Sequence, residues 1–177
     1  MSTKQMLLSG FGGQGILFAG KFLAYKGLTD GKQVSWLPSY GPEMRGGTAS
    51  CSVIISDDAV GSPIISNPDI LVAMNLPSLD KFENTVVSGG IILADSTLIE
   101  RKVERTDVTV YYVPATRLAS ENGFPTLANM ILMGKLLEVL DGFNTDDAKA
   151  TLSKVISAKR ADMLETNLKA LKLGAEF

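Results

Sequence analysis

The chain has 177 residues, of which 17 are Lys or Arg and 19 are Asp or Glu, so its formal net charge is −2. A nearly neutral chain without a basic stripe is not typical of a nucleic-acid-binding protein. Its apolar share of 45% and charged share of 20% exclude global disorder. No apolar run approaches the roughly 18 residues of a membrane span, and the N-terminus does not resemble a secretion signal. We therefore expect a cytoplasmic protein with one domain, residues 1–177.

Two residue types that carry much of protein chemistry are absent or nearly so. The chain has no histidine, which excludes a Ser/His/Asp or Cys/His nucleophilic centre and a histidine-ligated zinc site within it. Cys51 is the single cysteine, so the chain alone can hold neither an internal disulfide nor a four-cysteine iron–sulfur cluster. Cys51 begins the apolar run 51–55 and is interpreted as a buried strand residue. The sequence identifies no catalytic residue and no metal site.

The first third of the chain alternates strand and helix signals. The apolar run at residues 5–9 predicts a buried strand. Apolar residues at helical spacing predict a helix that begins after Gly15 and is broken by Gly27 and then by Asp30-Gly31. Residues 34–37 predict a second strand. Strand, glycine-rich turn, helix and strand together indicate a βαβ unit of Rossmann-like type.

The rest of the chain is first β-rich and then helical. We expect strands at 49–56, near Val60, at 69–74, 90–95 and 108–113, and a short helix around 78–83. Residues 127–140 are apolar almost all round and predict a buried helix. Another helix should follow Asn144, and a last helix should stop at Gly174. These elements predict the α/β class: a three-layer α/β/α domain with a mixed sheet.

A glycine-rich turn matching G-x-G-x-x-G lies at residues 10–15, between the first predicted strand and helix. Glycines there permit a tight turn and let backbone N–H groups approach a phosphate, and the helix N-terminus adds partial positive charge. The Gln14 amide is a candidate donor to a phosphate, a ribose or a partner chain. A tight turn without any ligand is the alternative. The candidate cofactor-binding residues of this turn are Gly10, Gly12, Gly13, Gln14 and Gly15.

Two nucleotide-binding motifs are incomplete in this chain. In a dinucleotide-binding Rossmann unit, an acid that binds ribose ends the second strand about 20 residues after the glycines, but here that strand ends in Leu37-Pro38. Asp30 lies in the turn before the strand. Residues 15–21 read G-x-x-x-x-G-K, yet Phe22 replaces the Ser or Thr that would bind magnesium in a P-loop.

A second loop, residues 39–48, combines one carboxylate and one guanidinium with three glycines and a proline. Glu43 and Arg45 can pair with each other across the turn. Alternatively, the glycines allow close approach of a ligand or a neighbouring subunit, to which Arg45 would be a forked donor. Tyr40 is an interface aromatic or a packed loop residue. The candidate interface residues are Tyr40, Glu43, Arg45, Gly46 and Gly47.

Asn129 completes the set of candidate site residues. On a helical wheel it projects opposite Glu138, toward the apolar side of the helix predicted at 127–140. A buried amide needs hydrogen-bond partners. Asn129 is therefore expected either to satisfy the first turn after Thr126 or to reach a ligand.

The two loops together resemble the gamma subunit of the 2-oxoacid:ferredoxin oxidoreductases, a family that acts on pyruvate, 2-oxoglutarate, branched-chain 2-oxoacids and indolepyruvate. The second loop is most similar to the 2-oxoglutarate and 2-oxoisovalerate branch. The resemblance spans nearly the whole chain, because it continues through residues 68–69, 114–117, 128–130 and 167–171.

The resemblance implies a multisubunit enzyme that decarboxylates a 2-oxoacid on thiamine diphosphate, reduces ferredoxin through iron–sulfur clusters and transfers the acyl group to coenzyme A. Thiamine diphosphate, Mg and the clusters are expected on alpha, beta and ferredoxin-like partner subunits, because this chain has no Gly-Asp-Gly…Asn thiamine signature and no cysteine set. Coenzyme A is then the possible ligand of the glycine-rich turn. The alternatives are a free-standing Rossmann-type dinucleotide enzyme and a non-catalytic binding module of the same fold.

Overall fold

The computed structural model describes residues 3–39, 47–140 and 147–177. Within these residues one mixed sheet is formed by β1 (Lys4–Phe11), β2 (Gln33–Ser39), β3 (Thr48–Ser56), β4 (Ile70–Ala73), β5 (Ile91–Asp95) and β6 (Thr109–Val113). The order across the sheet is β2-β3-β1-β4-β5-β6. Strands β1, β4, β5 and β6 are parallel, whereas β3 is antiparallel to both of its neighbours.

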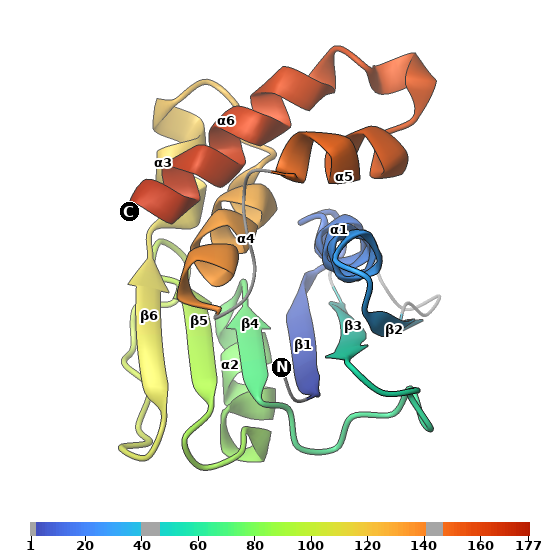
Figure 1. Cartoon of the computed structure of the whole chain (residues 1–177). Helices are drawn as coiled ribbons and strands as arrows, with labels where there is room; N and C mark the ends of the chain where they lie inside the picture. The colour runs from blue at the N-terminus through green and yellow to red at the C-terminus, as the bar shows by residue number, and fades with distance from the viewer. Residues whose placement is uncertain (1–2, 40–46, 141–146) are drawn as a thin grey trace.

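Helices cover both faces of this sheet (Figure 1). The helices are α1 (Ile16–Thr29), α2 (Leu76–Phe82), α3 (Ala115–Glu121), α4 (Ala128–Val139), α5 (Ala148–Val155) and α6 (Met163–Glu176), with short 3-10 turns η1 (Glu83–Thr85) and η2 (Ala158–Arg160). Helices α1 and α4 lie on one face, where α5 packs on α1 and α6 packs on α4, and α2 lies on the opposite face. The predicted α/β class with a mixed sheet is confirmed. No helix in the described ranges is long and apolar enough to cross a membrane.

Alternate residues of the strands supply two apolar cores. In β1, Met6 and Leu8 join the core beneath α1 and α4, whereas Leu7 joins the core beneath α2. Because side chains alternate between the faces of a strand and helices cover both faces, the parallel strands carry consecutive apolar residues, as at 6–8 in β1 and 70–73 in β4. This is why short apolar runs in the sequence located the strands.

The structure corrects the predicted secondary structure near Val60 and after Pro114. The strand expected near Val60 is absent: residues 57–69 contain no strand, and β4 follows at Ile70. Pro63 and Gly61, which disfavour a strand interior, lie in this segment. Helix α3, which follows Pro114, was not predicted. It is anchored by Asp95 at the end of β5, whose carboxylate accepts hydrogen bonds from the Thr116 backbone N at 3.1 Å and Oγ1 at 2.5 Å.

Two glycines that the sequence analysis assigned as helix ends, Gly27 and Gly174, lie inside helices in the structure. A Cβ atom on Gly27 would lie 2.9 Å from Cγ2 of Val34, so glycine lets α1 lie close to the sheet. Helix α1 ends at Thr29, with Asp30 as its C-cap, and Gly31 follows with a φ of +72° that suits glycine, so the predicted break at Asp30-Gly31 is confirmed. Gly174 does not stop α6, which continues to Glu176.

Helices α4 and α6 cross with their backbones in contact. A Cβ atom on Gly134 would lie 1.9 Å from the carbonyl oxygen of Leu171. A Cβ atom on Gly174 would lie 1.8 Å from the carbonyl oxygen of Ile131. Only hydrogen fits at these two positions, because real Cβ atoms do not come within 3 Å of such atoms. The two glycines therefore fix the distance between α4 and α6.

Helix α1 and strand β3 meet at a second close contact. A Cβ atom on Gly20 would lie 2.3 Å from Sγ of Cys51. The Cys51 thiol is 1% exposed and donates to the carbonyl oxygen of Ile16 at 3.5 Å. Burial raises the pKa of this thiol to about 12. The interpretation of Cys51 as a buried strand residue is confirmed.

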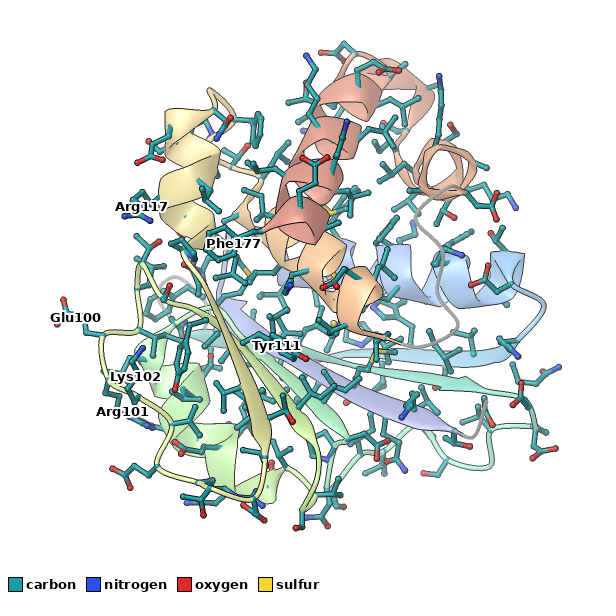
Figure 2. The ribbon with its side chains drawn as sticks, turned by 60° about the vertical axis from the view of Figure 1, so that its left-hand side comes forward. Glu100, Arg101, Lys102, Tyr111, Arg117 and Phe177 are labelled. Atoms are coloured by element: carbon teal, nitrogen blue, oxygen red, sulfur yellow. The ribbon has the colours of Figure 1, made fainter. Side chains whose placement is uncertain are left out.

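Charged side chains hold the β5–β6 connection against α2. The Arg101 guanidinium contacts Asp80 at 2.6 Å and Glu83 at 2.7 Å. Glu83 is buried, and its carboxylate also accepts from the backbone N of Glu104 at 2.6 Å. Figure 2 shows Arg101 and Lys102 projecting from this connection near the β6 edge of the sheet. The arrangement is structural, because Arg101, Asp80 and Glu83 are paired with one another within the fold.

We expect Gly134→Ala to destabilise the protein, although alanine favours an isolated helix over glycine. The added methyl group must push α6 away from α4, a form of overpacking that costs about 1–3 kcal/mol. For a chain of this length this is a fall in melting temperature of roughly 2–4 °C per kcal/mol. Gly61→Ala is the control, because a Cβ atom there meets nothing within 4 Å. Thermal melts in which Gly134→Ala equals or exceeds the parent would contradict the close contact.

Candidate functional site

The carboxyl ends of β1 and β4 lie side by side near the centre of the sheet. From β1 the chain passes through α1 on one face toward β2, and from β4 it passes through α2 on the other face toward β5 (Figure 1). Ligands of α/β proteins bind where adjacent strands send their connections in opposite directions. The glycine-rich turn, residues 10–15, lies at this point.

Two glycines of the turn have backbone conformations that favour glycine. The φ angles of Gly13 and Gly15 are +97° and +75°. Gly13 is exposed with open space beside it, whereas Gly15 is the N-cap of α1. The backbone N of Gly12 donates to the carbonyl oxygen of Gly47 at 3.4 Å. The glycine-rich turn therefore contacts the second loop at Gly47.

The side chain of Gln14 joins the ends of the two central strands. Its Oε1 accepts from the backbone N of Phe11 at 2.6 Å, and its Nε2 donates to the carbonyl oxygen of Met74 at 3.1 Å. Gly10 gives this amide room, since a Cβ atom there would lie 2.5 Å from Oε1. The structure thus shows a positioning role for Gln14. Its expected role as a donor to a ligand or partner stays a prediction.

Asn129, in the first turn of α4, contacts Gly15, the last glycine of the turn. Its Nδ2 donates to the carbonyl oxygen of Gly15 at 3.1 Å, and a Cβ atom on Gly15 would lie 2.4 Å from that nitrogen. Asn129 is 3% exposed, and its Oδ1 has no hydrogen-bond partner among the described residues. The Asn129 amide therefore bonds to the start of α1. It does not bond to the first turn of its own helix, as one of the two sequence-based expectations had it.

A cavity of about 430 Å³ opens beside the start of α1. The first backbone N–H groups of α1 have no partner within the helix, and the helix dipole places partial positive charge there. The cavity lies among α1, α4, the end of α5, η2 and α6. Its described lining residues are Gly15, Phe18, Thr126, Leu127, Asn129, Val155, Ile156, Ser157, Arg160, Met163 and Asn167.

Asn167 is the site residue that sequence reasoning missed. It is 2% exposed, its Nδ2 donates to the carbonyl oxygen of Met163 at 2.8 Å, and its Oδ1 has no partner among the described residues. A signal was available: Asn167 lies within the apolar stripe of Leu164, Leu168 and Leu171 in the last predicted helix. The wheel argument that singled out Asn129 applies equally to this amide.

The remaining predicted residues are only partly placed. Gly47 contacts the glycine-rich turn, as described above. Tyr40, Glu43, Arg45 and Gly46 lie outside the described residues, so their expected interface role stays a prediction. The described ranges contain no cluster of three or more His, Cys, Asp or Glu side chains suited to a metal ion.

A second hollow lies at the β6 edge of the sheet. Phe177 is exposed and lies beside Arg117 in Figure 2, and both line this hollow together with Ser96, Thr97, Tyr112 and Pro114. None of these lining residues is among the buried polar groups without a partner in the described chain. The cavity at α1 is therefore the stronger candidate site.

The opening βαβ unit differs from a dinucleotide-binding unit. Strand β3 lies between β1 and β2 and pairs antiparallel with both. In a dinucleotide site the second strand lies beside the first, so that its terminal acid reaches the ribose. Here β2 lies one strand away and ends in Leu37, Pro38 and Ser39. The structure gives no support to the dinucleotide alternative.

Comparisons with known proteins agree with this arrangement. The family model for pyruvate ferredoxin/flavodoxin oxidoreductase matches residues 5–177. The chain is 41% identical over 171 residues to the ketoisovalerate oxidoreductase subunit VorA of Methanothermobacter thermautotrophicus, covering 96% of this chain and 35% of VorA. It is 38% identical over 177 residues to the 2-oxoglutarate synthase subunit KorC of Methanocaldococcus jannaschii, covering 98% of this chain and 92% of KorC.

A solved structure shows the same fold. The gamma subunit of the keto/oxoacid ferredoxin oxidoreductase from Geobacter sulfurreducens has a TM-score of 0.83 and 28% sequence identity. The match covers 98% of this chain and 96% of that one. The chain thus spans nearly all of KorC and of this gamma subunit, but only about a third of the length of VorA.

We expect Gly15→Ala to cost more stability than Gly13→Ala. Both substitutions impose a positive φ on alanine, at roughly 1–2 kcal/mol. Only the Cβ atom at position 15 collides with Asn129, whereas position 13 is open. In the Asn129→Ala background the difference between the two variants should shrink, which urea unfolding measures as a double-mutant cycle. Equal losses in both backgrounds would show that Asn129 does not hold the turn.

Proposed function

We propose, because the chain belongs to the pyruvate ferredoxin/flavodoxin oxidoreductase family, that it is the gamma subunit of a multisubunit 2-oxoacid:ferredoxin oxidoreductase. The family resemblance of the two loops is confirmed by this match. The complex would convert a 2-oxoacid, coenzyme A and oxidised ferredoxin to acyl-CoA, CO₂ and reduced ferredoxin. 2-Oxoglutarate and 2-oxoisovalerate are the proposed substrates, in line with the names of KorC and VorA.

The relatives support a role inside a larger assembly. KorC, which this chain matches over nearly its full length, is named as a subunit. In VorA the similar region is joined to a further two thirds of polypeptide. We therefore propose alpha and beta thiamine-binding subunits and a ferredoxin-like subunit as partners, and ferredoxin as the electron acceptor. Within such a complex, residues 1–177 form one gamma-type domain.

The composition of the chain supports a division of labour with these partners. It has no histidine, and its one cysteine is buried with a raised pKa. Thiolates are the ligands of iron–sulfur clusters, so we assign the clusters, thiamine diphosphate and Mg to the partner subunits. This chain then supplies an assembly surface and part of the coenzyme A site. Coenzyme A, when bound, supplies the thiol that accepts the acyl group.

The contact between Asn129 and Gly15 carries the proposal for coenzyme A. It holds the first turn of α1 against α4, so the N–H groups at the start of α1, which have no partner within a helix, keep a fixed position next to the cavity. Gly13 and Gly15 supply the positive φ angles that the turn needs. Preorganised N–H donors at a helix N-terminus suit an anion such as the diphosphate of coenzyme A.

The proposed assembly surface adjoins this turn. Phe11 and Leu76, which flank the carboxyl ends of β1 and β4, are 38% and 37% exposed. In the second loop, the carbonyl oxygen of Gly47 accepts a hydrogen bond from the backbone N of Gly12. Apolar side chains that surround a polar loop are typical of a protein–protein interface. We propose that Tyr40, Glu43, Arg45, Gly46 and Gly47 contact the catalytic subunits there.

We expect the purified chain alone to show no reduction of ferredoxin or viologen with 2-oxoacid and coenzyme A, and the reconstituted complex to be active.

We expect the Gly12→Val chain to fold, but the complex that contains it to have a higher KM for coenzyme A or a lower turnover. The reason is that a branched side chain then lies where an anion must approach. Thermal melts of the lone chain check folding. A variant complex with unchanged KM and turnover would show that the turn binds no ligand, and activity of the lone chain would refute the subunit role.

We expect Arg45→Ala to leave the melting temperature of the isolated chain nearly unchanged while weakening assembly or lowering complex activity at least several-fold. Truncating a charged partner buried at an interface costs roughly 2–5 kcal/mol of binding, against about 0–1 kcal/mol for an exposed pair within the chain. Lys172→Ala is the control, since Lys172 is exposed and only weakly paired with Glu176 at 3.6 Å. A lower melting temperature with normal assembled activity would make Arg45 structural.

A further inference from the structure

We propose that the free edge of β6 pairs two copies of this chain in an antiparallel two-fold contact centred on Tyr111, which continues the sheet from one copy into the other. The inference goes beyond the proposed function, because it depends on no 2-oxoacid, cofactor or other subunit. Three observations carry it: the free backbone groups of Val110 and Tyr112, the composition of β6, and the charges at its two ends.

Strand β6 is the last strand of the described sheet and pairs on one side only, with β5. The backbone N of Thr109 and the carbonyl oxygen of Val113 bond to the residues that flank the two ends of β5. Val110 and Tyr112, at the alternating positions, therefore direct their N–H and C=O groups away from β5. No hydrogen bond from a described residue reaches these outward groups. The edge thus offers two donors and two acceptors to another strand.

The edge lacks the features that protect a free strand from pairing. Residues 109–113 read Thr-Val-Tyr-Tyr-Val, all of them strand-favouring and none of them charged. Their pairing with β5 runs without a bulge from one end of the strand to the other. The opposite edge of the sheet, β2, contains Pro38, which has no N–H to offer to another chain. Of the two edges, β6 is therefore the one suited to adding a strand.

The spacing of the outward groups selects a two-fold antiparallel pair. With Tyr111 opposite Tyr111 of the second copy, Val110 of each copy lies opposite Tyr112 of the other. Opposite residues of an antiparallel pair can exchange both of their hydrogen bonds, so this register satisfies the outward groups of both copies. A parallel two-fold pair would set Val110 opposite Val110, whereas parallel strands stagger their bonding residues by one position, as β5 and β6 do. The antiparallel pair is a closed dimer.

The side chains along β6 suit this register. The two Tyr111 residues occupy a non-hydrogen-bonded pair, in which the Cα atoms are about 4.5 Å apart, and aromatic pairs of this kind stabilise strand pairing. Lys135 lies 5.5 Å from the centroid of the Tyr111 ring, and Glu138 at 2.8 Å compensates its charge. Figure 2 shows Tyr111 and Lys102 on opposite sides of β6, so the Lys102 charge lies away from the aromatic contact.

Opposite charges lie at the two ends of the strand. Asp107 precedes β6 and Arg117 follows it in α3, with side chains that are 45% and 60% exposed. The hydrogen-bonded Arg105 guanidinium lowers the pKa of Asp107 to about 2, so this carboxylate is charged at neutral pH. An antiparallel pair sets the beginning of one strand beside the end of the other, which brings Asp107 of each copy toward Arg117 of the other. Within its own copy Arg117 is only weakly paired, with Glu121 at 3.8 Å.

The first test is the mass of the full chain in solution, measured by analytical ultracentrifugation over a dilution series. We expect an equilibrium between the chain mass of 18.9 kDa and twice that mass. Its dissociation constant should lie in the micromolar range, because one short strand pair is at the small end of specific interfaces. A single monomer mass up to millimolar concentration would overturn the proposal.

Variants of β6 and α3 locate the contact. Val110→Pro removes an outward N–H and leaves the bonds to β5 in place, so it should weaken the dimer at least tenfold, with folding verified by thermal melts. Arg117→Glu should weaken it several-fold, because like charges then face each other. Lys149→Glu is the matched control, since Lys149 is 65% exposed and pairs only weakly with Glu165, at 3.5 Å. A dimer that none of these substitutions weakens would overturn the proposal.

A cysteine at the two-fold axis tests the register and also serves if Val110→Pro does not fold. Tyr111→Cys should give a disulfide-linked dimer with diamide, since Cα atoms about 4.5 Å apart lie within the roughly 4.4–6.8 Å that a disulfide spans. Thr109→Cys is the control: it lies on the same face of β6 but opposite residue 113, so its two thiols are too far apart. Cys51 is 1% exposed and gives little background. Equal cross-linking of the two variants would refute the register.

The same variant separates a second copy from a partner subunit as the occupant of the edge. A chain that is monomeric alone, and whose Tyr111→Cys thiol is protected from alkylation only in the reconstituted complex, would assign the edge to a partner and overturn the proposal. The activity of that complex does not enter. An inactive complex with an intact dimer of this chain would refute the subunit role alone, and an active complex with a monomeric chain would refute the dimer alone.

Discussion

The backbone contact between α4 and α6 is the constraint on which the site depends. Gly134 and Gly174 let the two helices approach until the carbonyl oxygens of Leu171 and Ile131 occupy the space of a side chain. This approach brings Asn129 and Asn167 to the wall of one cavity. Any larger residue at either glycine would separate the two amides, because helix backbones move as rigid units.

From α4 the constraint passes to the sheet through hydrogen bonds. Asn129 holds the start of α1 at Gly15, and Gln14 ties the same turn to both central strands. Hydrogen bonds to α4 and to the ends of β1 and β4 thus fix the glycine-rich turn in the absence of a ligand. A turn that is already ordered loses less conformational entropy when a ligand binds.

Local sequence patterns predicted the elements but not what lies opposite them. The apolar runs located β1, β4 and β5, and the apolar segment at 127–140 located α4, because burial on all sides leaves a continuous signal. Gly27 and Gly174 were assigned wrongly as helix ends, since the sequence does not show which backbone a glycine faces. Gly15, the hydrogen-bond partner of Asn129, is 114 residues away in the sequence. The position of β3 between β1 and β2 depends on which strands pair with one another. Such contacts depend on tertiary structure, which local propensity does not encode.

The burial of Cys51 against α1 makes this thiol a reporter for the attachment of that helix. Burial raises the pKa of the Cys51 thiol to about 12, so very little of it is the reactive thiolate at neutral pH. The buried Cys51 thiol of the folded chain should therefore react only slowly with iodoacetamide. Labelling requires α1 to leave β3, so the labelling rate measures how often the helix that carries the glycine-rich turn detaches from the sheet.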